Sequence, residues 1–204
     1  MNLAELRQLA AVKPPALGNL ADNLVFGEGD PDARLMIVGE APGEDEDIQG
    51  RPFVGRAGQL LDKILASVGI ERESVYITNM VKFRPPGNRN PTPEEIAASE
   101  ELLMAQIAAI APQVIATLGN VPTQYFLKTT DGITKTHGKR FDWHEIIVFP
   151  LYHPAYLLRN ASREKGAPKW QTWEDMQALR ALLAGLPPKQ SGSKFATVKQ
   201  EALF

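Results

Sequence analysis

Four short apolar runs recur along the chain, separated by longer segments with a helical spacing of apolar residues. The runs are rich in β-branched or aromatic residues and are bounded by turn residues, which is typical of buried strands. They occupy residues 34–38, 74–78, 113–117 and 146–149. Strands that alternate with helices predict an α/β fold, a three-layer α/β/α sandwich around a central, mostly parallel sheet of four strands.

Helices are predicted between and around these strands. Residues 58–68 place Leu and Ile at every third or fourth position. Residues 93–110 follow Thr92, a candidate N-cap, and begin with proline and two glutamates, which favour a helix start. The remaining expected helices span residues 1–11, 122–127 and 170–183.

The composition is that of a globular protein, with 44 % hydrophobic and 23 % charged residues in a chain of 204. No apolar run approaches the ~20 residues that span a bilayer, and the first residues do not resemble a secretion signal. We therefore expect a cytoplasmic protein without membrane contact. The chain has no cysteine, which excludes disulfides, thiolate zinc sites and cysteine-held iron–sulfur clusters.

The last part of the chain differs from the rest. From residue 187 the composition changes to Pro, Lys, Gln, Ser and Gly, which is typical of a flexible segment. We expect one domain over residues 1–186, a tail over residues 187–204, and a monomer.

Polar residues follow the predicted strands at their carboxyl ends, where ligands bind in open α/β sheets. Glu40 follows the first strand, Asn79 the second, and His153 the fourth. Each of these alone is as well explained by a turn or by packing. Together they would bring a carboxylate, a carboxamide and an imidazole to one edge, which suits recognition of a polar heterocycle and stabilisation of charge on it.

Basic residues cluster in the loops at the same edge, although the net charge of the chain is −2. The cluster includes Lys82, Arg84 and Arg89 after the second strand, and Arg159 beyond His153. Charged loops are often only solvated. Basic loops on one edge of an acidic protein nevertheless favour contact with a polyanion such as nucleic acid.

These loops together resemble the uracil-DNA glycosylases, in particular the family 4 group. The resemblance covers about residues 25–177. The stretches that carry it occur in the order and spacing of the family and are residues 39–47, 50–58, 77–82, 84–91 and 152–158.

The resemblance implies an enzyme of base excision repair that removes uracil from DNA, and it assigns roles to residues. It places Phe53 against the extruded uracil, Asn79 at the Watson–Crick edge of the base, and His153 beside the negative charge of the leaving base. Glu40 and Glu46 belong to the first catalytic motif. DNA contact is expected from a wedge and from basic loops, at Tyr156, Leu157, Arg159, Lys82, Arg84 and Arg89.

The chain departs from the family in one respect. Family 4 enzymes hold an iron–sulfur cluster with four cysteines, whereas Phe83 and Ser99 stand at two of the ligand positions here. We therefore expect no cofactor and no metal. We expect Phe83 to pack inward with Leu17, Leu20 or Val12 and so to fill the space of the cluster.

The tail ends in Gln200, Leu203 and Phe204, and this ending resembles the peptide that binds the bacterial sliding clamp. Such short apolar motifs insert into grooves of partner proteins. A terminal segment that folds onto its own domain is the alternative.

Two other functions remain open from the sequence. The first is a glycosylase of the same fold for another deaminated base, such as hypoxanthine or xanthine. The second is a non-catalytic, clamp-tethered protein that binds lesions.

Overall fold

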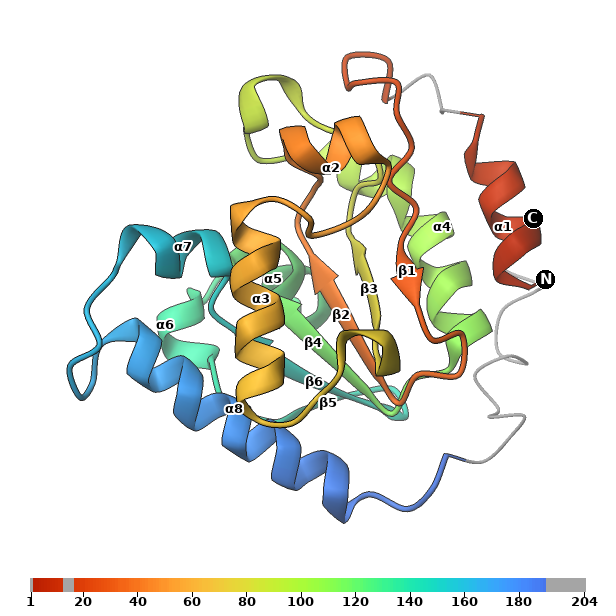
Figure 1. The fold of residues 1–204 in the computed structure, drawn as a ribbon. Coiled ribbons are helices and arrows are strands. Elements are labelled where there is room, and N and C mark those ends of the chain that lie inside the picture. The colour runs from red at the N-terminus through yellow and green to blue at the C-terminus, as the bar shows by residue number, and fades with distance from the viewer. Residues whose placement is uncertain (1, 13–16, 190–204) are drawn as a thin grey trace.

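The computed structural model describes residues 2–12 and 17–189. Its centre is a six-stranded sheet with the strand order β1-β3-β2-β4-β6-β5 (Figure 1). The strands are β1 (Glu28–Gly29), β2 (Leu35–Gly39), β3 (Tyr76–Asn79), β4 (Val114–Leu118), β5 (Phe141–Trp143) and β6 (Ile146–Leu151). The four central strands pair in parallel, and β1 and β5 pair antiparallel at the two edges.

The α/β class and the parallel centre of the sheet are confirmed, but the expectation of four strands is wrong. The two additional strands are two and three residues long. Segments this short carry too few positions for a period of two to be recognised. They form because the edges of the parallel sheet offer unpaired backbone groups.

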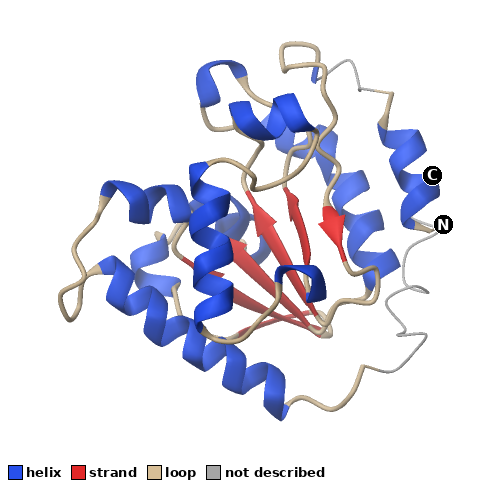
Figure 2. Cartoon of the chain, in the orientation of Figure 1, coloured by secondary structure: helices blue, strands red, loops and turns tan. Residues whose placement is uncertain are grey.

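Helices cover both faces of the sheet (Figure 2). They are α1 (Leu3–Ala10), α2 (Glu44–Gln49), α3 (Arg56–Ser67), α4 (Pro93–Ile110), α5 (Asn120–Leu127), α6 (Ile133–Thr136), α7 (Pro154–Arg159) and α8 (Pro168–Gly185). The predicted start of α4 is confirmed, because Thr92 Oγ1 accepts a hydrogen bond from Glu95 N and the Glu95 carboxylate accepts one from Thr92 N. The short helices α2, α6 and α7 were not predicted.

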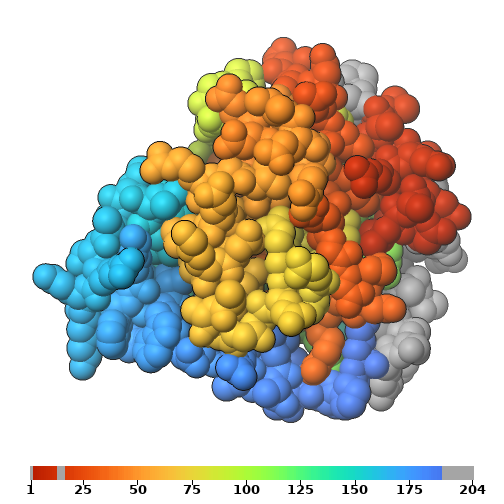
Figure 3. Space-filling view, in the orientation of Figure 1, coloured from red at the N-terminus to blue at the C-terminus, as the bar shows by residue number. Residues whose placement is uncertain are grey.

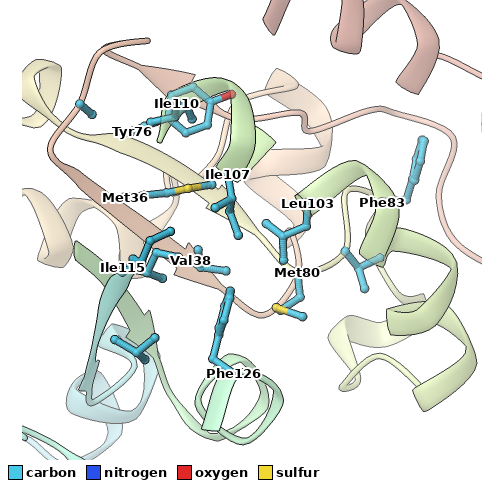
Figure 4. Close-up of a cluster of buried hydrophobic side chains, with 14 of the residues drawn as sticks. Met36, Val38, Tyr76, Met80, Phe83, Leu103, Ile107, Ile110, Ile115 and Phe126 are labelled. Carbon is cyan, nitrogen blue, oxygen red and sulfur yellow. The ribbon is translucent and has the colours of Figure 1, made fainter. Parts of the chain in front are cut away.

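Alternate residues of each central strand point to opposite faces, so that the core has two halves. Met36 of β2 lies in the half formed with α4 and α5, which includes Leu103 and Phe126 (Figure 4). Ile37 lies in the half formed with α3 and α8, which includes Leu61 and Met176. The side chains of α2, α3 and the loop after α3 hide the sheet from this second side (Figure 3).

The segment before β1 is fastened to the loop that follows β3. Ala21 N donates to Arg84 O at 2.9 Å and Val25 N donates to Lys82 O at 2.8 Å. Helix α1 adds a small cluster in which Leu6 packs with Phe26 and with side chains of α4. Among the described residues, no helix has the length and hydropathy required to cross a bilayer.

Candidate functional site

The carboxyl ends of β2 and β3 lie side by side and place three groups in contact. Gly39 and Asn79 are paired in the register of the two strands. A Cβ atom at position 39 would lie 2.3 Å from Asn79 Oδ1 and 2.6 Å from Phe53 Cζ. The absence of a side chain at Gly39 therefore allows the carboxamide of Asn79 and the ring of Phe53 to meet over the end of β2.

The carboxamide of Asn79 is buried, and its oxygen is left without a hydrogen bond within the described part of the chain. The residue is 1 % exposed, and Oδ1 has no hydrogen-bond partner among the described residues. A buried polar atom without a partner costs about 1–3 kcal/mol. Such an atom at the carboxyl edge of an α/β sheet is what a site for a polar ligand requires.

Phe53 stands in a strained backbone conformation that its surroundings enforce. Its φ is +52°, in the left-handed region that a bulky residue rarely adopts. Gly58 makes this loop possible, because a Cβ atom there would lie 1.9 Å from Phe53 O. Arg72 holds the preceding peptide through a 2.7 Å hydrogen bond from Nη2 to Pro52 O. The backbone that carries the ring is thus held by its neighbours.

Glu46 also holds the Phe53 loop. Its Oε1 accepts hydrogen bonds from Val54 N and Gly55 N, both at 2.8 Å, and its Oε2 accepts one from Gly43 N at 3.1 Å. Both carboxylate oxygens therefore join the turn after β2 to the loop that carries the aromatic ring. This arrangement positions Phe53, whereas the sequence had placed Glu46 among the catalytic groups.

His153 comes to the site from β6, as the N-cap of α7. Its ring centroid lies 5.8 Å from that of Phe53. Gly119, at the end of β4, leaves room for His153, because a Cβ atom at position 119 would lie 3.1 Å from His153 Cβ. Nδ1 accepts a hydrogen bond from Ala155 N at 3.1 Å, so the proton of the neutral ring is on Nε2. Burial, with a smaller contribution from the charge of Arg159, lowers the pKa of His153 to about 4. At neutral pH the residue is an uncharged donor.

Glu40 directly follows β2 and is partly buried. Burial raises the pKa of its carboxyl group above the ordinary value. Within the described part of the chain, no side chain or amide donates a hydrogen bond to its carboxylate. The group is therefore available to water or to a ligand at the carboxyl end of β2.

The residues expected to contact DNA fall into three groups. Tyr156 and Arg159 lie on the surface of α7, and the Tyr156 ring stacks on that of Tyr152 at 5.5 Å. Lys82 and Leu157 are each 1 % exposed, so the expectation that they contact DNA is wrong for this structure. The side chain of Lys82 turns inward because hydrogen-bond acceptors lie in the interior of the protein. Leu157 turns inward because it lies on the inner face of α7, a segment that the sequence analysis had treated as a loop.

The other two basic residues of this set are held by neighbours. Arg89 forms a two-bond pair with Glu95, at 2.8 and 2.6 Å, and its side chain is 40 % exposed. Arg84 Nε donates to Asn88 Oδ1 at 2.8 Å. Both guanidinium groups are pre-oriented at the rim beside α2. The tail residues Gln200, Leu203 and Phe204 lie outside the described residues.

Sequence reasoning missed the residues that support the site. Arg72 carries no recognisable signal, because it acts on a loop that is distant in sequence. Gly119 directly follows β4, the third predicted strand, but the residue that it approaches, His153, is distant in sequence. Gly39 and Gly58 do lie in the motifs that were singled out, and a glycine directly after a strand indicates a close approach of the backbone.

Comparison with known proteins shows the family of the chain. The sequence model of the uracil DNA glycosylase superfamily matches residues 26–177. The chain belongs to this superfamily. A Type-4 uracil-DNA glycosylase from Thermotoga maritima is 54 % identical over 147 residues, which cover 70 % of this chain and 75 % of the relative. One from Sulfurisphaera tokodaii is 46 % identical over 192 residues, which cover 90 % and 84 %. A Type-5 uracil-DNA glycosylase from Thermus thermophilus is 32 % identical, with 66 % of each chain covered.

The residues of this member of the superfamily do not fit an iron–sulfur cluster. Phe83 has no ligating atom, and Ser99 Oγ donates to Glu95 O at 2.9 Å within α4. Phe83 is 2 % exposed and lies at one end of the core half that contains Leu17 and Leu20 (Figure 4). The expected inward packing of Phe83 is confirmed with these two residues, whereas Val12 is 78 % exposed. Apolar packing thus joins the segment before β1 to the loop after β3.

Replacing Glu46 by Gln tests its part in holding the Phe53 loop. Gln has an –NH2 group, which cannot accept a hydrogen bond, in place of one of the two carboxylate oxygens, so at least one backbone N–H would lose its partner. We expect the free energy of unfolding in urea to fall by about 1–3 kcal/mol. Glu101→Gln, on the exposed side of α4, is the matched control and should be neutral. Unchanged stability of Glu46→Gln would contradict a positioning role.

The protonation of His153 can be followed by nitrogen-detected NMR. We expect a neutral ring with the proton on Nε2 at pH 6 and a midpoint about pH 4. Because the unfolded chain binds this proton nearer pH 6.5, the contribution of His153 to stability should be lost as the pH falls from 6.5 towards 4. A midpoint near 6.5, or a proton on Nδ1, would refute the assignment.

Proposed function

We propose that the protein is a uracil-DNA glycosylase, which hydrolyses the N-glycosidic bond of deoxyuridine in DNA and leaves an abasic site. It would act in the first step of base excision repair. The observation that carries this proposal is the buried carboxamide oxygen of Asn79, which has no partner among the described residues. It lies beside the Phe53 ring, which in turn lies near His153.

Recognition of the base follows from the first two of these groups. A duplex hides the glycosidic bond, so the nucleotide has to leave the stack at a cost of a few kcal/mol. The face of Phe53 offers a stacking surface for the extruded pyrimidine. The carboxamide of Asn79 has one donor and one acceptor side, which match the O4 acceptor and the N3–H donor of uracil.

Cleavage of the bond requires stabilisation of charge on both fragments. When the bond between C1′ and N1 breaks, its electron pair leaves with the base, and the sugar becomes cationic at C1′. The Nε2–H of His153 donates to the pyrimidine oxygen on which the negative charge gathers. The carboxylate of Glu40 stabilises the cation and orients the water that adds to C1′. The water that adds to C1′ loses one proton, which neutralises the uracil anion, so that the products are free uracil and an abasic sugar with a hydroxyl group at C1′.

The DNA backbone is proposed to cross the edge of the sheet that carries the site. Arg84 and Arg89 lie at the rim beside α2, and Arg159 lies at the end of α7. Their positive charges would be met by phosphates. The surface residue Tyr156 is placed to fill part of the space that the extruded nucleotide leaves.

An end-labelled oligonucleotide with one uracil, treated with alkali after incubation, tests the activity. We expect cleavage at uracil with chelator present. We expect Asn79→Ala and His153→Ala each to lower the single-turnover rate by roughly 100–1,000-fold while DNA affinity is kept, because each removes a preorganised hydrogen-bonding group. Asn23→Ala, in an exposed loop, is the matched control.

Substrates with hypoxanthine, xanthine and thymine are compared in the same assay. Cleavage at hypoxanthine or xanthine in place of uracil would overturn the substrate assignment. Binding to DNA without cleavage at any base would overturn the assignment as an enzyme.

We also propose that the tail ending in Gln200, Leu203 and Phe204 binds the bacterial sliding clamp. The support is the sequence pattern alone. Tethering would raise the local concentration of the enzyme at replicated DNA, so that it acts at the nucleoid.

Deletion of residues 200–204 tests this tether. We expect the full chain to be retained on immobilised clamp and the truncated chain to pass through, with equal excision of uracil from free oligonucleotides. Equal retention of the two chains would refute the proposal.

A further inference from the structure

Asn79 belongs to a cluster of fully buried polar residues, the other members of which lie on the side of β3 that faces α4. Thr78, Asn79, Lys82 and Gln106 are each at most 1 % exposed. The cluster joins β3, the turn after it and α4. Lys82 lies among the basic residues of a loop that was expected to contact DNA, yet it points into the protein.

The hydrogen bonds of this cluster meet at the end of β3. Lys82 Nζ donates to Asn79 O at 2.5 Å and to Thr78 Oγ1 at 2.7 Å. Thr78 Oγ1 donates to Phe26 O at 2.9 Å, and Gln106 Nε2 donates to the same oxygen at 2.9 Å. The main chain of Asn79 is therefore linked to the segment before β1 and to α4.

The amine of Lys82 has no negative partner. Within the described residues, no carboxylate lies within 4 Å of Nζ. Complete burial holds the pKa of Lys82 well below its ordinary value. A neutral amine has two N–H groups, which match the two acceptors that lie around it, whereas an ammonium group would have a third without a partner.

We propose that Lys82 is a positioning residue, which holds the main chain of Asn79 so that the carboxamide presents one fixed edge to the extruded base. The inference deepens the proposed function of the site and rests on it. The main-chain hydrogen bond matters because Asn79 is the last residue of β3 and its side-chain oxygen has no partner of its own.

Fixation of this carboxamide decides which base is recognised. Rotation by half a turn exchanges the donor and the acceptor of an asparagine, and the exchanged order matches cytosine instead of uracil. Contact with Gly39 and Phe53 limits the space for the side chain. The hydrogen bond from Lys82 fixes the backbone from which the side chain extends. A displacement of a reacting or recognising group by about 1 Å can cost about 100-fold in rate.

Lys82→Met, which keeps the length of the side chain and removes its donors, is the direct test. We expect the single-turnover rate of uracil excision to fall about tenfold, which corresponds to the loss of one hydrogen bond. The affinity for uracil-free DNA should not change, because Lys82 does not reach the surface. Lys63→Met, on the exposed side of α3, is the matched control and should behave as the wild type.

The pH dependence of stability provides a readout that is independent of DNA. Between the lowered pKa of folded Lys82 and about pH 10.4, the unfolded chain binds one proton more than the folded chain. In this range, the free energy of unfolding of the wild type should therefore increase with pH relative to that of Lys82→Met. The same difference should be absent between the wild type and Lys63→Met.

The Asn79 carboxamide NMR signals separate a failure of this inference from a failure of the proposed function. In Lys82→Met we expect broadened or shifted Asn79 signals, whether or not the wild type cleaves DNA. Unchanged signals would overturn the positioning role, as would a rate equal to that of the wild type. A wild type that does not excise uracil would overturn the proposed function but not the link between Lys82 and Asn79.

Discussion

The close approach of Gly39, Asn79 and Phe53 at the carboxyl end of the sheet is the constraint on which the site depends. It requires parallel pairing of β2 with β3, because only this register brings the two strand ends level. It also requires a residue without a side chain at position 39 and a left-handed backbone at Phe53. A single methyl group at Gly39 would close the space that the carboxamide and the ring share.

The energetic cost of this arrangement is distributed over its surroundings. The unusual backbone of Phe53 is held by Glu46, which accepts a hydrogen bond from Val54 N, and by Arg72, which donates one to Pro52 O. The end of β3 is held by a buried amine without a countercharge. Groups that would be destabilising elsewhere are thus collected around one carboxamide, as is common where a protein prepares a binding site in advance of its ligand.

Apolar packing fastens the N-terminal segment of this chain at positions where the resemblance to family 4 implies cluster ligands. Phe83 lies in the core with Leu17 and Leu20, while two backbone hydrogen bonds join residues 21 and 25 to the loop after β3. The carboxyl ends of β2, β3 and β6 are positioned by the sheet itself. The chemistry proposed for the site therefore depends on strand register and not on the group that fastens the N-terminal segment.

The sequence by itself determined the α/β class, the four parallel strands, the limits of α4 and the positions of Glu40, Asn79 and His153 after strand ends at one edge. These features depend on local periodicity, capping and the rule that strand ends meet. The place of Phe53 near these strand ends was expected only from the resemblance to the family. Only the tertiary structure decided that Lys82 is buried, that Glu46 holds a loop, and that Leu157 faces inward. The direction of a side chain depends on acceptors and packing partners distant in the chain: Val54 and Gly55 for Glu46, and the buried strand end for Lys82. Local sequence carries no record of such partners, because they come together only when the sheet has formed.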